Sequence, residues 1–126
     1  MNLLVVGGGG REHGIIQSLK KNPDVTKIYA LPGNGGIAND AECVAIGATD
    51  IEGIVNFART HAIDFAVVAP DDPLVLGCTD ALEELGIPVH YLLFRHLLKT
   101  RSLLAFFSAL QNIVSDVMHL DRTVHV

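Results

Sequence analysis

The feature that most restricts the fold of this chain is a run of four glycines, Gly7–Gly10, between an apolar segment and a segment with helical periodicity. The apolar segment is Leu3–Val6, and Ile15, Ile16 and Leu19 follow the glycines at the spacing of one helix face. This pattern predicts a strand, a tight turn and a helix. In an open α/β sheet, the first strand-to-helix turn lies at the carboxyl edge of the sheet, where ligands bind.

The glycine turn has the properties of a site for a phosphate group. Glycine permits a positive φ and leaves no Cβ in the way of a ligand. The start of the following helix presents N–H groups and a partial positive charge, and Arg11 adds a guanidinium suited to an anion. Glu12 is expected to repel a polyphosphate but to hydrogen-bond a hydroxyl or an amine of the ligand. The alternative is that the glycines only form a tight turn of the fold.

The residues around the glycines do not match the two common nucleotide-binding motifs. In a G-x-G-x-x-G motif that starts at Gly7, Glu12 stands where the third glycine belongs. The second predicted strand ends in Tyr29–Pro32, which supplies no carboxylate for a ribose. A Walker A loop ends in Gly-Lys-Ser/Thr, whereas Gly14 is followed by Ile15. Neither NAD nor the phosphates of an NTP are therefore well supported as ligands.

The first 88 residues alternate between strand and helix patterns. The predicted strands cover residues 2–6, 26–31, 42–46 and 65–69, with a fifth from residue 87, and the predicted helices cover residues 13–21, 51–61 and 74–85. Thr49 or Asp50 is expected to cap the second helix, and Gly86 to end the third. The alternation predicts an α/β fold, an open parallel sheet with helices on both faces.

Three loops are predicted at the carboxyl edge of this sheet: Gly7–His13, Pro32–Gly36 and Pro70–Pro73. Adjacent loops on that edge can surround one small ligand, although the sequence does not reveal the strand order. Asn34 is expected either to form an Asx-turn or to contact the ligand directly. Of the two aspartates in the third loop, one is expected to cap the helix that follows and the other to accept from ribose hydroxyls.

The sequence shows no nucleophile–base pair, no metal-ligand cluster and no pair of catalytic carboxylates, so no catalytic residue or metal ligand is predicted. His13 is expected to orient or pack within the site, and His61 to interact with the end of its helix. Cys43 and Cys78 lack the spacing of zinc ligands and are predicted to be reduced core thiols.

Composition and charge exclude several classes of protein. The chain is 49% hydrophobic, which suits strands buried on both faces, and its net charge of −5 disfavours a nucleic-acid partner. Its apolar runs are shorter than the roughly 18 residues of a membrane span, and the charged start of a signal peptide is missing. We therefore expect a cytoplasmic protein that binds neither nucleic acid nor a membrane.

Four segments in unbroken order over residues 1–88 resemble the phosphoribosylamine–glycine ligase (glycinamide ribonucleotide synthetase) family. They are Gly-Gly-Arg-Glu-His, Pro-Gly-Asn-Gly-Gly, Asp-Ile-Glu-Gly-Ile-Val-Asn-Phe-Ala and Val-Val-Ala-Pro-Asp-Asp-Pro-Leu. The first two together are specific, whereas either alone would be a weak signal. The last resembles the family's Gly-Pro-Glu-x-Pro-Leu, with Ala69 in place of glycine.

The resemblance implies the amino-terminal, pre-ATP-grasp domain of an enzyme, with a Rossmann-like sheet. That enzyme joins 5-phosphoribosylamine to glycine in de novo purine synthesis and uses ATP and Mg²⁺. The resemblance also implies that glycine is activated as an acyl phosphate, which the amine then attacks. The substrate-binding residues that it implies are Gly9, Gly10, Arg11, Glu12, Pro32, Gly33, Asn34, Asp71, Asp72, Pro73 and Leu74. Two alternatives are a stand-alone Rossmann-like module for a nucleotide or sugar phosphate, and a non-catalytic interaction fragment.

The resemblance stops at Pro88, where the composition also changes. All 12 glycines and all 5 prolines lie at or before Pro88, and 12 acidic and 5 basic residues give way to 2 acidic and 4 basic residues after it. The family's Phe-Gly-Pro and Ser-Lys helix do not follow. Residues 89–126 are interpreted as an out-of-frame translation, a divergent helical extension or a spliced or designed end.

The tail has no resemblance to an ATP-grasp domain. We therefore expect no ATP, Mg²⁺ or glycine site in this chain, no ligation by the chain alone, and at most weak capture of a sugar phosphate. The apolar residues 92–110 are expected to promote self-association. The alternative is that one helix of the tail covers an open face of the sheet.

Overall fold

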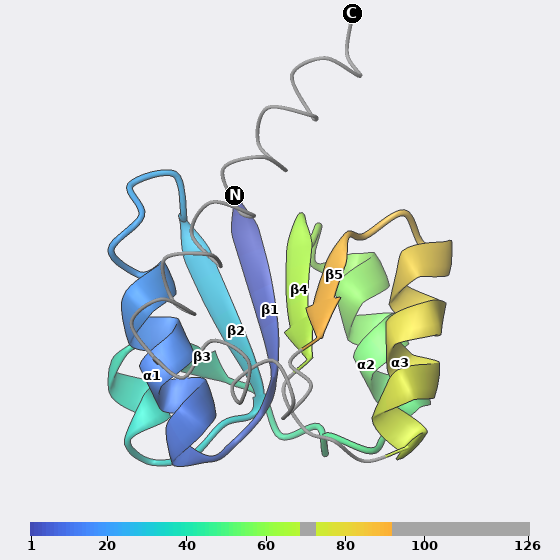
Figure 1. The fold of residues 1–126 in the computed structure, drawn as a ribbon, viewed down its shortest axis with the longest axis horizontal. Coiled ribbons are helices and arrows are strands. Elements are labelled where there is room, and N and C mark those ends of the chain that lie inside the picture. The colour runs from blue at the N-terminus through green and yellow to red at the C-terminus, as the bar shows by residue number, and fades with distance from the viewer. Residues whose placement is uncertain (69–72, 92–126) are drawn as a thin grey trace, which may run out of the picture.

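A computed structural model describes residues 1–68 and 73–91, which form a five-stranded parallel sheet with helices on both faces (Figure 1). The strands are β1 (Asn2–Gly7), β2 (Lys27–Pro32), β3 (Glu42–Cys43), β4 (Phe65–Val68) and β5 (Val89–Tyr91). The helices are α1 (Gly10–Leu19), α2 (Ile51–Thr60) and α3 (Pro73–Glu84), with a 3₁₀ helix η1 (Ile37–Asn39). The predicted fold class is confirmed. The self-associating segment predicted at 92–110 lies outside the described residues.

The strand order, β3-β2-β1-β4-β5, puts β1 at the centre of the sheet. From β1 the chain first builds β2 and β3 on one side and then crosses over to β4 and β5 on the other. The switch point between β1 and β4 is where open α/β sheets bind ligands. The carboxyl ends of β1, β2 and β4 are therefore neighbours, so the first two predicted loops lie side by side. The third loop follows β4, but residues 70–72 lie outside the described residues.

The core has two layers, one on each face of the sheet. In β1, Leu3 and Val5 face α1, whereas Leu4 and Val6 face α2 and α3, and all four are fully buried. Burial on both faces explains the continuous apolar run that precedes the glycines. Within the described residues, no helix is long and apolar enough to cross a membrane.

Two element boundaries differ from the prediction by three residues, whereas the other described boundaries differ by at most two residues. Helix α1 begins at Gly10 and not at His13, because Gly9 is the N-cap and its carbonyl accepts from the His13 N–H at 3.1 Å. Glycine has a low helix propensity, so the sequence gives no helical signal at these positions. Strand β3 has only two residues instead of 42–46, because the Ile46 N–H turns back to the Val44 carbonyl at 2.7 Å.

The predicted cap of α2 and the predicted end of α3 at Gly86 are confirmed. The Asp50 carboxylate accepts from the Gly53 N–H at 3.0 Å and caps α2. Gly86 follows α3 with a φ of +81°, and its N–H donates to the Glu83 carbonyl at 2.9 Å. The Ile87 N–H donates to the Leu82 carbonyl at 3.2 Å, which completes a Schellman motif.

The choice between the two predicted caps of α2 is testable. Asp50→Ala is expected to lower the free energy of unfolding by about 1 kcal/mol, because the first turn of α2 loses a side-chain acceptor. Thr49→Ala, the matched control, is expected to change it by less than about 0.5 kcal/mol. Urea denaturation of the 126-residue chain measures both, and an equal loss in the two variants would contradict the assignment.

Candidate functional site

The glycine turn after β1 and the loop after β2 are joined through their backbones. The last residue pair of the two strands is Gly7 with Pro32. Just beyond it, the Gly33 N–H donates to the Gly7 carbonyl at 3.1 Å, and the Asn34 side chain donates to the Gly8 carbonyl at 2.6 Å. A Cβ on Gly8 would lie only 2.6 Å from the Gly33 carbonyl oxygen. The two loops therefore form one surface, and glycine at position 8 is required for their close approach.

The first turn of α1 opens onto this surface. Gly9 is the extended N-cap, with φ −94° and ψ 179°, and Gly10 begins the helix. Both glycines are exposed, and a Cβ on Gly10 would meet no atom within 4 Å. The first turn of a helix presents N–H groups that the helix itself does not bond, together with a partial positive charge. This open space beside Gly10 can thus receive an anionic group.

Arg11 and Glu12 continue this first turn, but they differ in exposure. Arg11 is half-buried, whereas Glu12 is only 5% exposed. A Cβ on Gly7 would lie 2.5 Å from Oε1 of Glu12, and a Cβ on Gly9 would lie 3.0 Å from Oε2. The carboxylate is thus tucked against the glycine turn, at the third helical position where a capping box places its glutamate. The role predicted for Glu12, orienting the ligand, stays a prediction.

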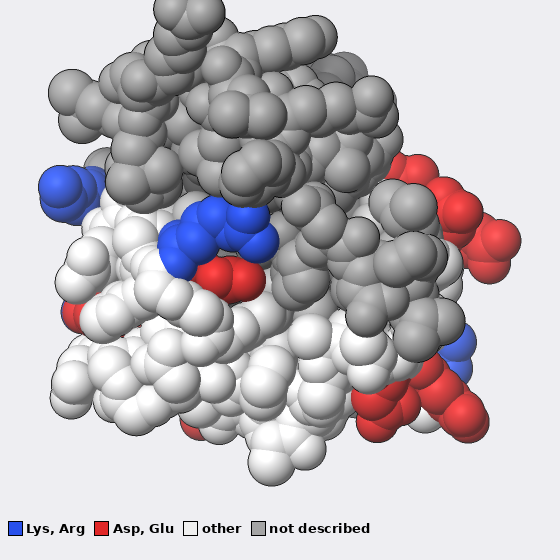
Figure 2. Space-filling model, turned by 60° about the horizontal axis from the view of Figure 1, so that its bottom comes forward, with Lys and Arg blue, Asp and Glu red and all other residues white. Residues whose placement is uncertain are grey.

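Figure 2 shows the carboxyl edge of the sheet from outside. Near the middle of this face, a basic and an acidic side chain lie together among uncharged described residues, and other charged groups lie toward the rim. The first turn of α1, which carries Arg11 and Glu12, opens onto the same edge. The described part of this edge is therefore largely uncharged apart from the basic and acidic side chains near its middle.

Asn34 ties the second loop to the glycine turn. Its Oδ1 accepts from the Ile37 N–H at 2.8 Å, and its Nδ2 donates to the Gly8 carbonyl. The Asn34 side chain thus bonds the backbone locally, but to the N–H three residues along the chain and not two as in the predicted Asx-turn. Direct contact with a ligand stays a prediction. The loop begins with Pro32, which is exposed and preceded by a cis peptide bond, and with Gly33, which is half-buried and has a φ of +70°.

His13 connects α1 to the far end of the same loop. Its Nε2 lies 2.8 Å from Oδ2 of Asp40, and the Lys20 ammonium lies 3.1 Å from Oδ1. Hydrogen bonds from His13 and then Lys20 hold the pKa of the Asp40 carboxyl below its usual value. The orienting role predicted for His13 agrees with this geometry. No local sequence pattern indicates a role for Asp40, because its partners are 27 and 20 residues away.

Comparison with known proteins identifies the family. The sequence profile described as "Phosphoribosylglycinamide synthetase, N domain" matches residues 1–90. The chain belongs to this N-domain family. It is 48% identical over 88 residues to the phosphoribosylamine–glycine ligase of Rhizobium meliloti and 47% identical over 90 residues to that of Allochromatium vinosum. Each alignment covers 70% of this chain, and the chain spans 21% of the length of either relative. The resemblance inferred from the four motifs is confirmed.

Two predicted residues of the N domain lie outside the described residues, namely Asp71 and Asp72. Pro73 is the first residue of α3, a position that suits proline because its missing N–H has no helical partner. Leu74 follows it in the same turn. Because α3 comes directly after β4, it also begins at the carboxyl edge of the sheet, so the backbone at these two positions is at the predicted edge.

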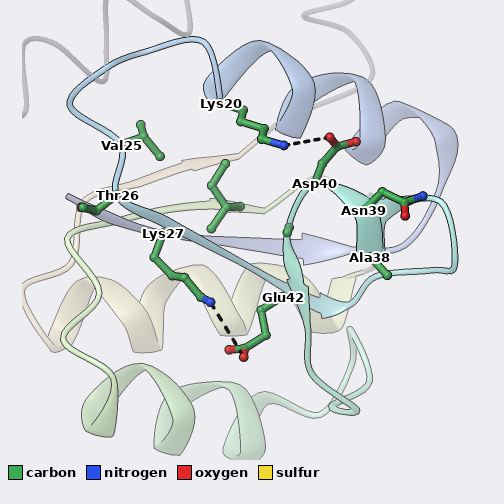
Figure 3. Close-up of a pocket in the computed structure, with 10 residues that line it drawn as sticks. Lys20, Val25, Thr26, Lys27, Ala38, Asn39, Asp40 and Glu42 are labelled. Carbon is green, nitrogen blue, oxygen red and sulfur yellow. Dashed lines mark hydrogen bonds and ion pairs between the residues drawn. The ribbon is translucent and has the colours of Figure 1, made fainter.

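A depression of about 340 Å³ lies elsewhere on the N domain, between the end of α1, the start of β2 and residues 38–42 (Figure 3). Two ion pairs line it, Lys20 with Asp40 at 3.1 Å and Lys27 with Glu42 at 3.9 Å. None of the predicted substrate-binding residues lines this depression. Because its charged groups pair with one another, it gives no indication of a ligand.

The two cysteines are both free. Cys78 belongs to α3 and is fully buried, and burial raises the pKa of its thiol to about 11. Cys43 is half-buried, and its thiol donates to the Asn34 carbonyl at 3.5 Å. The predicted core position is confirmed for Cys78. Cys43 is only partly buried and contacts the loop after β2. Among residues 1–68 and 73–91, no group of three His, Cys, Asp or Glu side chains could hold a metal ion.

The glycines of the turn are expected to differ in their tolerance of a side chain. Gly8→Ala is expected to destabilise the domain by about 1–3 kcal/mol, because its Cβ would overlap the Gly33 carbonyl. Gly10→Ala is the matched control, with an expected change below about 0.5 kcal/mol, because its Cβ enters open space. Thermal and urea denaturation measure both, and a tolerated Gly8→Ala would disprove the tight contact between the loops.

The stability of the domain is expected to depend on ionised Asp40. The folded-state pKa lies below the ordinary value of 3.8, so the stabilisation is complete above that value and is lost as the pH falls through the lower folded-state pKa. The stability difference between the natural chain and Asp40→Asn should be complete at about pH 5 and shrink below about pH 4. Urea titrations across this range measure it, and a difference that does not change with pH would contradict the assignment.

Proposed function

We propose that this chain is the substrate-binding N domain of an ATP-dependent ligase that joins 5-phosphoribosylamine to glycine in de novo purine biosynthesis. The observation that carries the proposal is the union of two loops, Gly7–Gly10 and Pro32–Asn34, through the hydrogen bonds to the Gly7 and Gly8 carbonyls. These loops hold the two motifs that together are specific to the family. The relatives named phosphoribosylamine–glycine ligase support the same assignment.

The chemistry of phosphoribosylamine suits this edge of the sheet. The substrate has a single phosphate, two ribose hydroxyls and an amine. A phosphate is stabilised by the N–H groups and partial charge at the start of α1, and the open space at Gly10 leaves room for it. The Arg11 guanidinium adds charge-assisted donors. The buried Glu12 disfavours a second phosphate beside it but accepts hydrogen bonds from a hydroxyl or an amine.

In the proposed reaction this chain binds and orients the nucleophile. Glycine is activated as an acyl phosphate, the amine attacks its carbonyl carbon, a C–N bond forms and inorganic phosphate leaves. The proposal assigns ATP, Mg²⁺ and glycine to parts of the ligase beyond the matched 90 residues, since the chain spans only 21% of the length of the two ligases compared above. ATP supplies the phosphoryl group of the acyl phosphate. The proposal includes a cytoplasmic location.

A chimeric ligase tests the proposal, with residues 1–88 of this chain in place of the aligned segment of the Rhizobium meliloti enzyme. Arg11→Ala is expected to raise the KM for phosphoribosylamine about 10- to 100-fold, because a hydrogen bond to a charged group contributes about 1.5–3 kcal/mol. The kcat and the KM for ATP are expected to stay within about twofold. Glu12→Gln, which keeps the shape of the buried side chain, is also expected to raise the KM for phosphoribosylamine.

Arg59→Ala, on the exposed surface of α2, is the control and should leave all kinetic constants unchanged. Unchanged kinetics in both Arg11→Ala and Glu12→Gln would overturn the assignment. The 126-residue chain alone provides a second measurement. Ribose 5-phosphate is expected to bind on the order of millimolar, because an open edge encloses little of the ligand. Protection by NADH or a UDP-sugar, and not by ribose 5-phosphate, would favour a nucleotide-binding module.

A further inference from the structure

The loop after β2 is fastened to the glycine turn and α1 at two separate places. At its start, Gly33 and Asn34 donate to the glycine-turn carbonyls. At its end, the Asp40 carboxylate reaches His13 and Lys20 of α1. Between them, the Asn34 Oδ1 accepts from the N–H of Ile37, the first residue of η1, and the Asp40 N–H donates to the Ile37 carbonyl at 2.9 Å. Residues 33–40 thus form a short closed unit whose position depends on both fastenings.

The His13 ring lies between Asp40 and the loop backbone. A Cβ on Gly36 would lie 3.3 Å from Cε1 and 3.4 Å from Nδ1 of His13, so the ring packs against the loop at this glycine. On its other side, Nε2 lies 2.8 Å from the Asp40 carboxylate. An ionised carboxylate only accepts hydrogen bonds, so Nε2 is the donor. Since His13 belongs to the first turns of α1, this contact links the loop directly to the proposed phosphate site.

We propose that Asp40 is a positioning residue of the phosphoribosylamine site, which acts by holding the His13 ring and so fixing the Gly33–Gly36 backbone against the start of α1. The inference rests on the proposed function. Asp40 lines the neighbouring depression and not the proposed substrate site, so it acts through His13. Its role is to preorganise the site, because a loop that is already in place loses less conformational entropy when the ligand binds.

The other partner of Asp40 contributes less to this role. The side chain of Lys20 is 55% exposed, whereas those of His13 and Asp40 are 27% and 21% exposed. An exposed ion pair contributes little, because water screens it and the long side chain loses freedom. Figure 3 shows Lys20 reaching Asp40 from the end of α1, which is the end away from the glycine turn. Lys20→Ala is therefore the matched control for the loss of the His13 contact.

The first test follows the loop in the 126-residue chain without any ligand. Asp40→Ala is expected to speed hydrogen exchange of the Gly33 and Ile37 amides about tenfold or more, because both amide hydrogen bonds belong to the fastened loop. Lys20→Ala should change these rates less than about twofold. The Gly53 amide, which Asp50 caps on α2, is the internal reference. Unchanged rates at Gly33 and Ile37 would overturn the inference.

The second test uses the chimeric ligase. Asp40→Ala and His13→Ala are each expected to raise the KM for phosphoribosylamine about tenfold, with kcat and the KM for ATP within about twofold. His13→Gln should restore much of the lost affinity, because its amide nitrogen can donate in place of Nε2. Asp64→Ala is the control for a purely structural loss, since Asp64 accepts from the Asn2 N–H at the amino end of β1.

The outcomes separate this inference from the proposed function. If Arg11→Ala raises the KM for phosphoribosylamine but Asp40→Ala does not, the positioning role is wrong and the proposed function stands. If Asp64→Ala raises that KM as much as Asp40→Ala does, the effect of Asp40 is general destabilisation and the inference fails. If Arg11→Ala, Glu12→Gln and Asp40→Ala all leave the KM unchanged, the proposed function fails and the inference fails with it. A rise in both, with rescue by His13→Gln, supports both.

Discussion

The proposed site depends on a contact between two backbones that carry no side chains where they meet. Gly8 and Gly33 approach so closely that a Cβ on the first would lie 2.6 Å from the carbonyl oxygen of the second. The parallel register of β1 and β2, with Gly7 opposite Pro32, delivers both segments to the same point at the carboxyl edge. The contact therefore comes from strand pairing, and the polar groups of Asn34 and Glu12 are arranged around it.

Much of this arrangement could be predicted from the sequence, because alternation and turn residues are local signals. The glycine run, the buried strands and the caps at Asp50 and Gly86 all belong to patterns a few residues long. The strand order, the burial of Glu12 and the pairing of Asp40 with His13 are different, because each depends on segments brought together by the fold. A carboxylate that follows four glycines resembles a ligand contact in the sequence, and only its position against Gly7 shows that it also packs the turn.

Under the proposed function, this turn is expected to disfavour nucleotide polyphosphates and to suit a sugar phosphate. The positive end of α1 attracts an anion, and the carboxylate of Glu12 beside the glycines limits how much negative charge can gather there. The site thus combines one attractive and one repulsive element, and specificity commonly needs both. His13 and Asp40 are proposed to affect the position of the loop and not the charge next to the ligand. Different residues therefore set the shape of the site and its electrostatic potential.

The shortness of β3 has a consequence for the edge of the sheet that this strand forms. A long exposed edge strand offers a row of free backbone groups to which a second chain can add, but β3 has only two residues and ends in a turn. Lys27 and Glu42 place opposite charges beside this border, about half exposed. Charged side chains on a short edge disfavour pairing between molecules. The edge of the sheet formed by β3 is thus protected against pairing with a second chain into fibres. This protection does not involve the carboxyl edge, where the proposed site lies.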